Sequence, residues 1–215
     1  MKIKVCGMRD PDNIRQVAEL PIHYMGFIFY EQSPRYVGAS TLADWTCPES
    51  LHRVGVFVNA SEEEIMLRVK QLGLTAVQLH GSESPELASS LKQKHLEVFK
   101  VFSIADKSDL QKTARYEDCC DYFLFDTQTP LHGGSGKSFD WNVLSEYKGN
   151  RPFFLSGGIG TEDTERLLQF KHPQWAGIDL NSRFELSPGY KNAALLSAFI
   201  NQLKTILNEQ NQSFI

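Results

Sequence analysis

Short apolar runs alternate with segments of helical periodicity along the whole chain. Residues 54–58, VGVFV, show the pattern: this run leads into Ser61-Glu62-Glu63-Glu64, a sequence typical of a helix start, and a periodic helix then continues to Leu72. Runs of the same kind predict eight strands, at residues 3–7, 24–30, 54–58, 76–80, 98–102, 122–126, 153–156 and 176–180.

The alternation predicts a parallel sheet covered by helices, because strands that are apolar on both faces must be buried on both faces. Eight strand–helix units in 215 residues lie at the small end of the (β/α)8 barrel class, and no linker or repeat divides them. We therefore predict a single (β/α)8 TIM-barrel domain over residues 1–215. A doubly wound open sheet is the alternative, although it usually has fewer strands and a nucleotide-binding loop after the first one. The expected helices include starts at Asp10-Pro11 and Ser84-Pro85, a weak helix near residues 41–45 and a last helix at 193–207.

Composition and charge narrow the class of function. Hydrophobic residues make up 41% of the chain and charged residues 22%, as in an ordinary globular protein. The formal net charge is −4, so no basic field gathers nucleic acid or an anionic membrane, although local basic groups can still hold a small anion. No apolar run is long enough to span a bilayer, and the N-terminus MKIKVCGM lacks the apolar core of a signal peptide. We expect a cytoplasmic protein without nucleic-acid or membrane partners.

The four cysteines show no spacing typical of a zinc site, and no cluster of His, Asp and Glu has metal-ligand spacing, so we expect no metal. Taken alone, each cysteine is interpreted as a small buried hydrophobe. Only Cys6 has a case for reactivity, since it ends the first predicted strand and Gly7 keeps the approach to it open. A thiol is mostly protonated at neutral pH, so Cys6 would need a local positive potential to react.

The segment HGGSGKS at residues 132–138 is similar to a nucleotide-binding P-loop but lacks a required residue. The P-loop pattern G-x-x-x-x-G-K-[ST] places a glycine at position 131, where this chain has Leu131. The segment also follows the sixth predicted strand and not the first. Two interpretations stay open: a plain surface loop, or a loop that closes over a ligand with its backbone amides.

Two later loops favour a phosphorylated ligand. The sequence SGGIGT at residues 156–161 follows the seventh predicted strand, and DLNSR at residues 179–183 follows the eighth. Barrels commonly build a phosphate site at these two positions. Glycines suit such a site because a Cβ would keep the phosphate away from the backbone amides.

Polar side chains at the strand ends are the candidates for chemistry, since barrel active sites lie at that end of the sheet. Asp126 could be an N-cap or a salt-bridge partner, or a carboxyl group whose raised pKa suits a general acid. Arg35, after Ser33-Pro34, could bind a carboxylate through two hydrogen bonds or be a solvated loop residue. His80 could be a general base or a hydrogen-bonded strand-end histidine.

Short motifs at these strand ends carry a family resemblance. In chain order they are KVCGM at residues 4–8, SPRY at 33–36, VQLHG at 77–81, FDT at 125–127, GGSG at 133–136 with FDW at 139–141, LSGG at 155–158 and SPGYK at 187–191. Each motif is weak by itself, whereas the ordered set is specific. The set resembles the phosphoribosylanthranilate isomerase family of tryptophan biosynthesis.

The resemblance implies an Amadori rearrangement of N-(5-phosphoribosyl)anthranilate, the third step of tryptophan synthesis from chorismate, with no metal or organic cofactor. It implies that Cys6 is the general base, that Asp126 is the general acid and that Arg35 binds the anthranilate carboxylate. Phosphate binding and loop closure would fall to Gly133, Gly134, Ser135, Gly136, Gly157, Gly158, Asn181 and Ser182. The match is imperfect after the eighth strand, where many members have Asp-Val-Ser-Ser-Gly and this chain has a bulkier Arg183 at the last position.

Two other functions stay open at this point. The first is another sugar-phosphate barrel enzyme, such as a different isomerase or an aldolase; an aldolase needs a buried strand-end lysine, for which Lys4 and Lys100 are poorly placed. The second is a non-catalytic barrel that only binds a phosphorylated ligand, although such a protein needs neither Cys6 nor Asp126. The sequence is compatible with a monomer or a homodimer.

Overall fold

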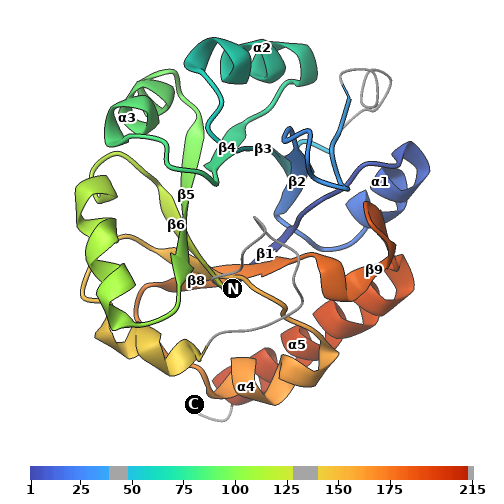
Figure 1. Cartoon of the computed structure of the whole chain (residues 1–215). Helices are drawn as coiled ribbons and strands as arrows, with labels where there is room; N and C mark the ends of the chain where they lie inside the picture. The colour runs from blue at the N-terminus through green and yellow to red at the C-terminus, as the bar shows by residue number, and fades with distance from the viewer. Residues whose placement is uncertain (39–47, 128–139, 213–215) are drawn as a thin grey trace.

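The predicted (β/α)8 barrel is confirmed by the computed structural model, which describes residues 1–38, 48–127 and 140–212. Eight parallel strands pair in sequence order, and β8 closes the ring by pairing with β1. The strands surround the centre of the molecule and the helices lie around them (Figure 1). Three sequence predictions lie outside the described residues: the weak helix at 41–45, the glycine-rich loop at 133–136, and Cys47.

All eight strands overlap the predicted apolar runs and differ from them mainly at the ends. The strands are β1 Lys2–Val5, β2 Tyr24–Ile28, β3 His52–Phe57, β4 Ala76–Leu79, β5 Glu97–Ile104, β6 Tyr122–Thr127, β7 Phe153–Leu155 and β8 Trp175–Leu180. β3, for example, begins two residues before its apolar run, because His52 already pairs with Tyr24 of β2. Pairing across the barrel therefore extends strands into polar residues that periodicity alone leaves out.

The segments between the strands are helical, but not all of them are α-helices. The α-helices are α1 Pro11–Ala18, α2 Glu62–Leu72, α3 Pro85–Gln93, α4 Thr164–Gln169 and α5 Ala193–Gln212, and the 3-10 segments are η1 Lys107–Tyr116, η2 Trp141–Glu146, η3 Thr161–Asp163 and η4 Ser182–Phe184. The backbone shows the tighter spacing at the start of η1, where the Asp109 amide donates to the carbonyl oxygen of Asp106, three residues earlier, at 3.2 Å. No helix among the described residues has the length and apolar character needed to cross a membrane.

Alternation along the strands decides which side chains point into the barrel. On β6, Phe123 and Phe125 pack outward into the core that the helices cover, whereas Leu124 belongs to a second cluster inside the ring. Asp126 is next in the inward series after Leu124, so its carboxyl group faces the barrel mouth. Side chains two residues apart on a strand share a face, so Cys6, which follows β1, points to the same side as the inward-facing Lys4.

A short antiparallel hairpin follows β8 and was not predicted from the sequence. Its strands are β9 Glu185–Ser187 and β10 Tyr190–Lys191, and Gly189 allows the turn between them with a φ of 85°. The side chain of Asn13 on α1 accepts from the Lys191 amide at 2.6 Å and donates to its carbonyl oxygen at 2.8 Å. These bonds hold the hairpin against the first helix of the chain, and β9 lies beside α1 in Figure 1.

Candidate active site

One cavity at the carboxyl ends of the strands brings together the predicted site residues that the structure describes. They come from loops spread over the whole ring: Cys6, Arg35, His80, Asp126, Gly157, Gly158, Asn181 and Ser182 all line it. Gly133, Gly134, Ser135 and Gly136 fall outside the described residues. The position is the one expected for the active site of a parallel barrel.

Asp126 is a buried carboxyl group with an unusual proton affinity. Burial, with a smaller contribution from the nearby Asp179 carboxylate, raises the pKa of Asp126 to about 6, although a bond accepted from the Thr127 amide at 2.8 Å opposes the shift. His80 Nε2 lies 3.7 Å from Asp126 Oδ2, and its Nδ1 lies 3.0 Å from the Gln78 side-chain nitrogen. About one molecule in ten then carries a proton on Asp126 at pH 7, against roughly one in a thousand for an ordinary aspartate.

This pKa shift makes a prediction about folding stability. Because the pKa of Asp126 is about 6 in the folded protein and 3.8 for an exposed aspartate, protonated Asp126 favours the folded state, and that stabilisation is lost as the pH rises through 6. Asp126→Asn removes this titration. We expect the free energy of unfolding of the variant, relative to wild type, to rise by about 2 kcal/mol between about pH 4.5 and about pH 7.5. Urea unfolding at the two pH values measures it, and a difference that is independent of pH would contradict the shift.

Cys6, which lines the same cavity, is a buried thiol with basic neighbours. Its residue is 3% exposed, and burial raises the pKa of the thiol, while the charges of Lys4 and Lys191 act in the other direction. Gly26 on β2 makes room for the sulfur, since a Cβ at that position would lie 2.7 Å from Sγ. The two buried lysines supply positive potential at the sulfur, but burial outweighs it, and the pKa of the Cys6 thiol stays above its ordinary value.

Lys4 is a neighbour of the site whose place there the sequence analysis did not assign. Its ammonium group lies inside the barrel and forms a 2.9 Å ion pair with Asp179. Burial by itself would lower the pKa of Lys4, but the Asp179 carboxylate raises it above its ordinary value, so Lys4 stays charged. The signal was available in the sequence, because residues 4 and 6 of one strand share a face.

Lys100 gives no support to an aldolase. It is on the outward face of β5 and donates to the carbonyl oxygens of Leu79 at 3.2 Å and Gly81 at 2.7 Å and to Glu83 Oε2 at 3.0 Å. Neither Lys100 nor Lys4 belongs to the cavity lining, so no lysine among the residues named there is placed to form a Schiff base with a ligand.

The loops after β7 and β8 supply the glycine-rich side of the cavity. Gly157 and Gly158 have φ values of 87° and 68°, and a Cβ at Gly157 would lie 2.8 Å from the Thr127 amide nitrogen and 2.9 Å from Asp126 Oδ1. Glycine is therefore required at position 157. Arg183 does not crowd this region, since its guanidinium is exposed and lies 3.6 Å from Glu162 Oε1.

Arg35 is on the loop that follows β2, with only 8% of its surface exposed. Its Nε lies 2.9 and 3.1 Å from the two carboxylate oxygens of Glu185, and its Nη2 lies 2.7 Å from Oε2. The remaining amino group, Nη1, has no hydrogen bond to any residue in the described part of the chain. The sequence analysis did not identify Glu185, which is 150 positions away and belongs to a strand of three residues.

The described residues contain no group of three or more His, Cys, Asp and Glu side chains arranged to hold a metal ion. The described lining of the cavity thus contains a carboxyl group, a thiol, an arginine and residues of the loops after β7 and β8.

Comparisons with known proteins place the chain in a family. The family model described as N-(5'phosphoribosyl)anthranilate (PRA) isomerase matches residues 3–202. The N-(5'-phosphoribosyl)anthranilate isomerase of Phocaeicola vulgatus is 55% identical over 204 residues, which cover 95% of this chain and 98% of the relative. The crystal structure of the phosphoribosyl anthranilate isomerase of Thermotoga maritima is 30% identical, with a TM-score of 0.84 over 95% of this chain and 99% of that one.

A third similar protein was solved with a ligand. It is a phosphoribosyl anthranilate isomerase in complex with reduced 1-(o-carboxyphenylamino)-1-deoxyribulose 5-phosphate, 28% identical, with a TM-score of 0.81 over 95% of this chain and 99% of that one. With the family model matched over nearly the whole barrel and a relative that shares more than half of its residues, this chain belongs to the N-(5'-phosphoribosyl)anthranilate isomerase family.

Proposed function

We propose that this chain converts N-(5-phosphoribosyl)anthranilate to 1-(2-carboxyphenylamino)-1-deoxyribulose 5-phosphate in tryptophan biosynthesis, with Asp126 as general acid and Cys6 as general base. Membership in the isomerase family supports the reaction. The observation that carries the assignment of roles is that a carboxyl group with a pKa raised to about 6 and a buried thiol face the same cavity.

The acid acts first. Asp126 donates its proton to the ribose ring oxygen while the bond between that oxygen and C1 breaks. The lone pair of the anthranilate nitrogen forms a C=N double bond to C1, and the ring opens to an iminium ion. A carboxyl group with a pKa of about 6 suits this step, because it still holds a proton near neutral pH and its conjugate base is weak enough to release it.

The base acts second. The iminium ion makes the proton on C2 acidic, and the Cys6 thiolate removes it. The C–H electrons form a double bond between C1 and C2, and the C=N electrons return to nitrogen. The resulting enolamine tautomerises to the ketone at C2, so the reaction is an isomerisation without net gain or loss of atoms. The charges of Lys4 and Lys191 favour the thiolate that this step requires, although burial outweighs them and the pKa of the Cys6 thiol stays above its ordinary value.

Two kinds of contact hold the substrate in this proposal. Nη1 of Arg35 donates to the anthranilate carboxylate. The phosphate lies against the backbone amides of Gly157 and Gly158, with Asn181 and Ser182 beside them. The loop with Gly133, Gly134, Ser135 and Gly136 closes over the ligand.

The test follows the fluorescence of freshly generated phosphoribosylanthranilate after the purified protein is added. Rapid loss with wild type, and near-background loss with Cys6→Ala and Asp126→Asn, supports the reaction together with its acid–base pair. No loss with folded wild type would reject the proposal. Tight binding of the phosphorylated ligand without any product would favour the non-catalytic barrel instead.

Arg35→Ala is expected to raise the Michaelis constant by about 10- to 100-fold, with a smaller change in the turnover number. The reason is that the guanidinium group contacts the carboxylate, which is remote from the reacting carbons and equally charged in substrate and transition state. Steady-state kinetics on the same fluorescence signal separates the two constants. An unchanged Michaelis constant would mean that another group binds the carboxylate.

A further inference from the structure

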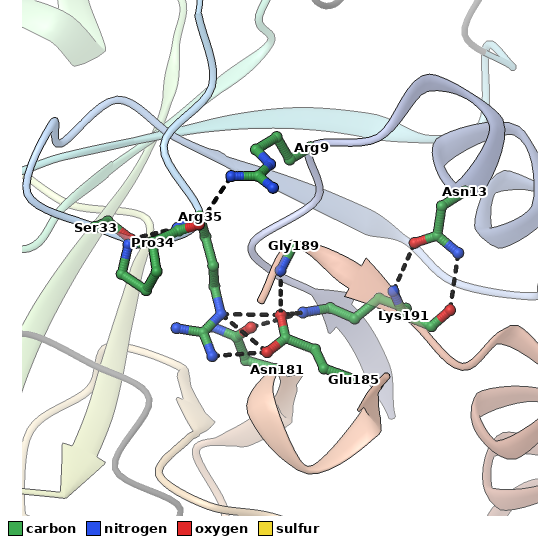
Figure 2. A network of polar contacts seen from close by, with 9 residues as sticks. All are labelled: Arg9, Asn13, Ser33, Pro34, Arg35, Asn181, Glu185, Gly189 and Lys191. Atoms are coloured by element: carbon green, nitrogen blue, oxygen red, sulfur yellow. Dashed lines mark hydrogen bonds and ion pairs between the residues drawn. The ribbon is translucent and has the colours of Figure 1, made fainter. Parts of the chain in front are cut away.

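Arg35 belongs to a network of polar groups whose contacts with one another play no part in the chemistry proposed above (Figure 2). At its centre is Glu185, the first residue of the hairpin. Glu185 Oε1 accepts from Lys191 Nζ at 2.6 Å and from the Gly189 amide at 3.0 Å, in addition to the contacts of both carboxylate oxygens with Arg35. Lys191 Nζ also donates to Asn181 Oδ1 at 2.7 Å.

Glu185 fixes the direction of the guanidinium group. The Glu185 carboxylate accepts hydrogen bonds from Nε and Nη2, which lie along one edge of the planar guanidinium group. Nη1 points away from Glu185 (Figure 2). Burial alone would raise the pKa of Glu185, but the bonds from Arg35 and the charge of Lys191 hold it below its usual value. Glu185 is therefore ionised, and its paired geometry with Arg35 persists near neutral pH.

Lys191 holds Glu185 in turn. Only 1% of its surface is exposed, and both of its backbone hydrogen-bonding groups are bonded to the side chain of Asn13. Burial lowers the pKa of Lys191 to about 8 although Glu185 opposes the shift, so the group is charged at neutral pH. A lysine held at its backbone and at its tip cannot move as a solvated side chain does.

We propose that Glu185 and Lys191 are positioning residues for the carboxylate of the substrate: held by Asn13 and the hairpin, they orient Arg35 so that Nη1 faces the cavity. This inference rests on the proposed function, in which Arg35 binds the anthranilate carboxylate. The carboxylate site is then built from both ends of the chain, by the loop after β2 and by the hairpin after β8.

Net charge and orientation of Arg35 are two explanations for binding of the carboxylate, and they predict opposite effects of Glu185→Gln on its affinity. Arg35, Glu185 and Lys191 together carry one net positive charge, and Glu185→Gln removes the negative partner. If charge alone bound the carboxylate, the variant would bind it as tightly as wild type or more tightly. If orientation matters, the variant binds it more weakly, because an amide accepts fewer bonds from the guanidinium and no longer pairs with its charge.

The experiment measures equilibrium binding of reduced 1-(o-carboxyphenylamino)-1-deoxyribulose 5-phosphate and of the same reduced compound made with aniline, which lacks the carboxylate. For Glu185→Gln we expect about 10-fold weaker binding of the first compound and unchanged binding of the second. Glu185→Asp keeps the negative charge but places the carboxylate farther from Arg35, because its side chain is shorter. It should show the same weaker binding of the first compound alone. Equal losses for both compounds, or no loss for the first, would overturn the proposal.

Two controls separate positioning from general damage. Glu117→Gln makes the same change at a glutamate that accepts from Tyr147 and Arg151 outside the cavity, and it should leave both dissociation constants unchanged. In the Arg35→Ala background, Glu185→Gln should cause no further loss, whereas additive losses would contradict action through Arg35. If wild type binds neither compound, the result counts against the proposed function itself. If wild type and Glu185→Gln bind the first compound equally, the result counts against the positioning role alone.

Discussion

Cys6→Ala is expected to lower the turnover number by about 100- to 10,000-fold while substrate binding stays nearly intact. The variant lacks the group that removes the C2 proton, and water is a poor replacement inside a buried cavity. The bulk of the ligand contacts a different set of residues, so the Michaelis constant should change little. Steady-state kinetics with phosphoribosylanthranilate measures both constants.

Cys119→Ala is the matched control for this change. Cys119 is also buried, but it follows η1, and its Sγ lies 3.5 Å from the Tyr116 carbonyl oxygen, outside the cavity lining. The same loss of a sulfur atom at that position should leave the turnover number unchanged. A Cys6→Ala variant with normal turnover would remove Cys6 from the mechanism.

Asp126→Asn is expected to reduce the turnover number by a similar factor, about 100- to 10,000-fold, and also to change the dependence of the rate on pH. The active form needs Asp126 protonated and Cys6 ionised. Burial raises the pKa of the Cys6 thiol, which lies far above the pKa of Asp126. At a pH between these two pKa values, a rise in pH lowers the fraction of protonated Asp126 and raises the fraction of ionised Cys6 by the same factor. The wild-type rate should therefore increase up to about pH 6 and then level off.

The two variants should then show opposite slopes above about pH 6. Asp126→Asn has no acid to lose, so its residual rate continues to rise as the thiolate forms. Cys6→Ala has no thiolate to gain, so its residual rate falls as Asp126 loses its proton. Asp121→Asn is the control, because Asp121 immediately precedes β6, at the end of the strand away from Asp126, where it accepts from the Val98 amide at 2.9 Å. Parallel profiles for the two site variants would contradict the assignment of acid and base.

The parts of the molecule that could be predicted from sequence are those with a repeating signal. Eight apolar runs, each followed by a helical period, were sufficient for the barrel, and the period of two along a strand places Asp126 and Cys6 at the mouth. Of the alternatives that the sequence left open for Asp126, the raised pKa agrees with the structure, because an aspartate after a buried strand at a barrel mouth is removed from water.

The parts that could not be predicted depend on contacts between distant short segments. The hairpin strands have three and two residues, which is too short for any periodic pattern. The pairing of Arg35 with Glu185 joins residues 150 positions apart, and neither residue carries a local sign of the other. The 3-10 character of η1 and η2 was missed for a related reason, since apolar spacing distinguishes poorly between turns of 3.0 and 3.6 residues in short segments.

The pairing of β1 with β8 has a consequence for the order in which this protein matures during translation. Asp179 leaves the ribosome about 10 to 35 seconds after its partner Lys4, at roughly 5–20 residues per second. Glu185 and Lys191 emerge later still. Before β8 is made the ring is open and Lys4 lacks its partner Asp179. Before the hairpin is made Arg35 lacks its partner Glu185. The nascent chain can therefore complete the cavity only after β8 has been made and has paired with β1.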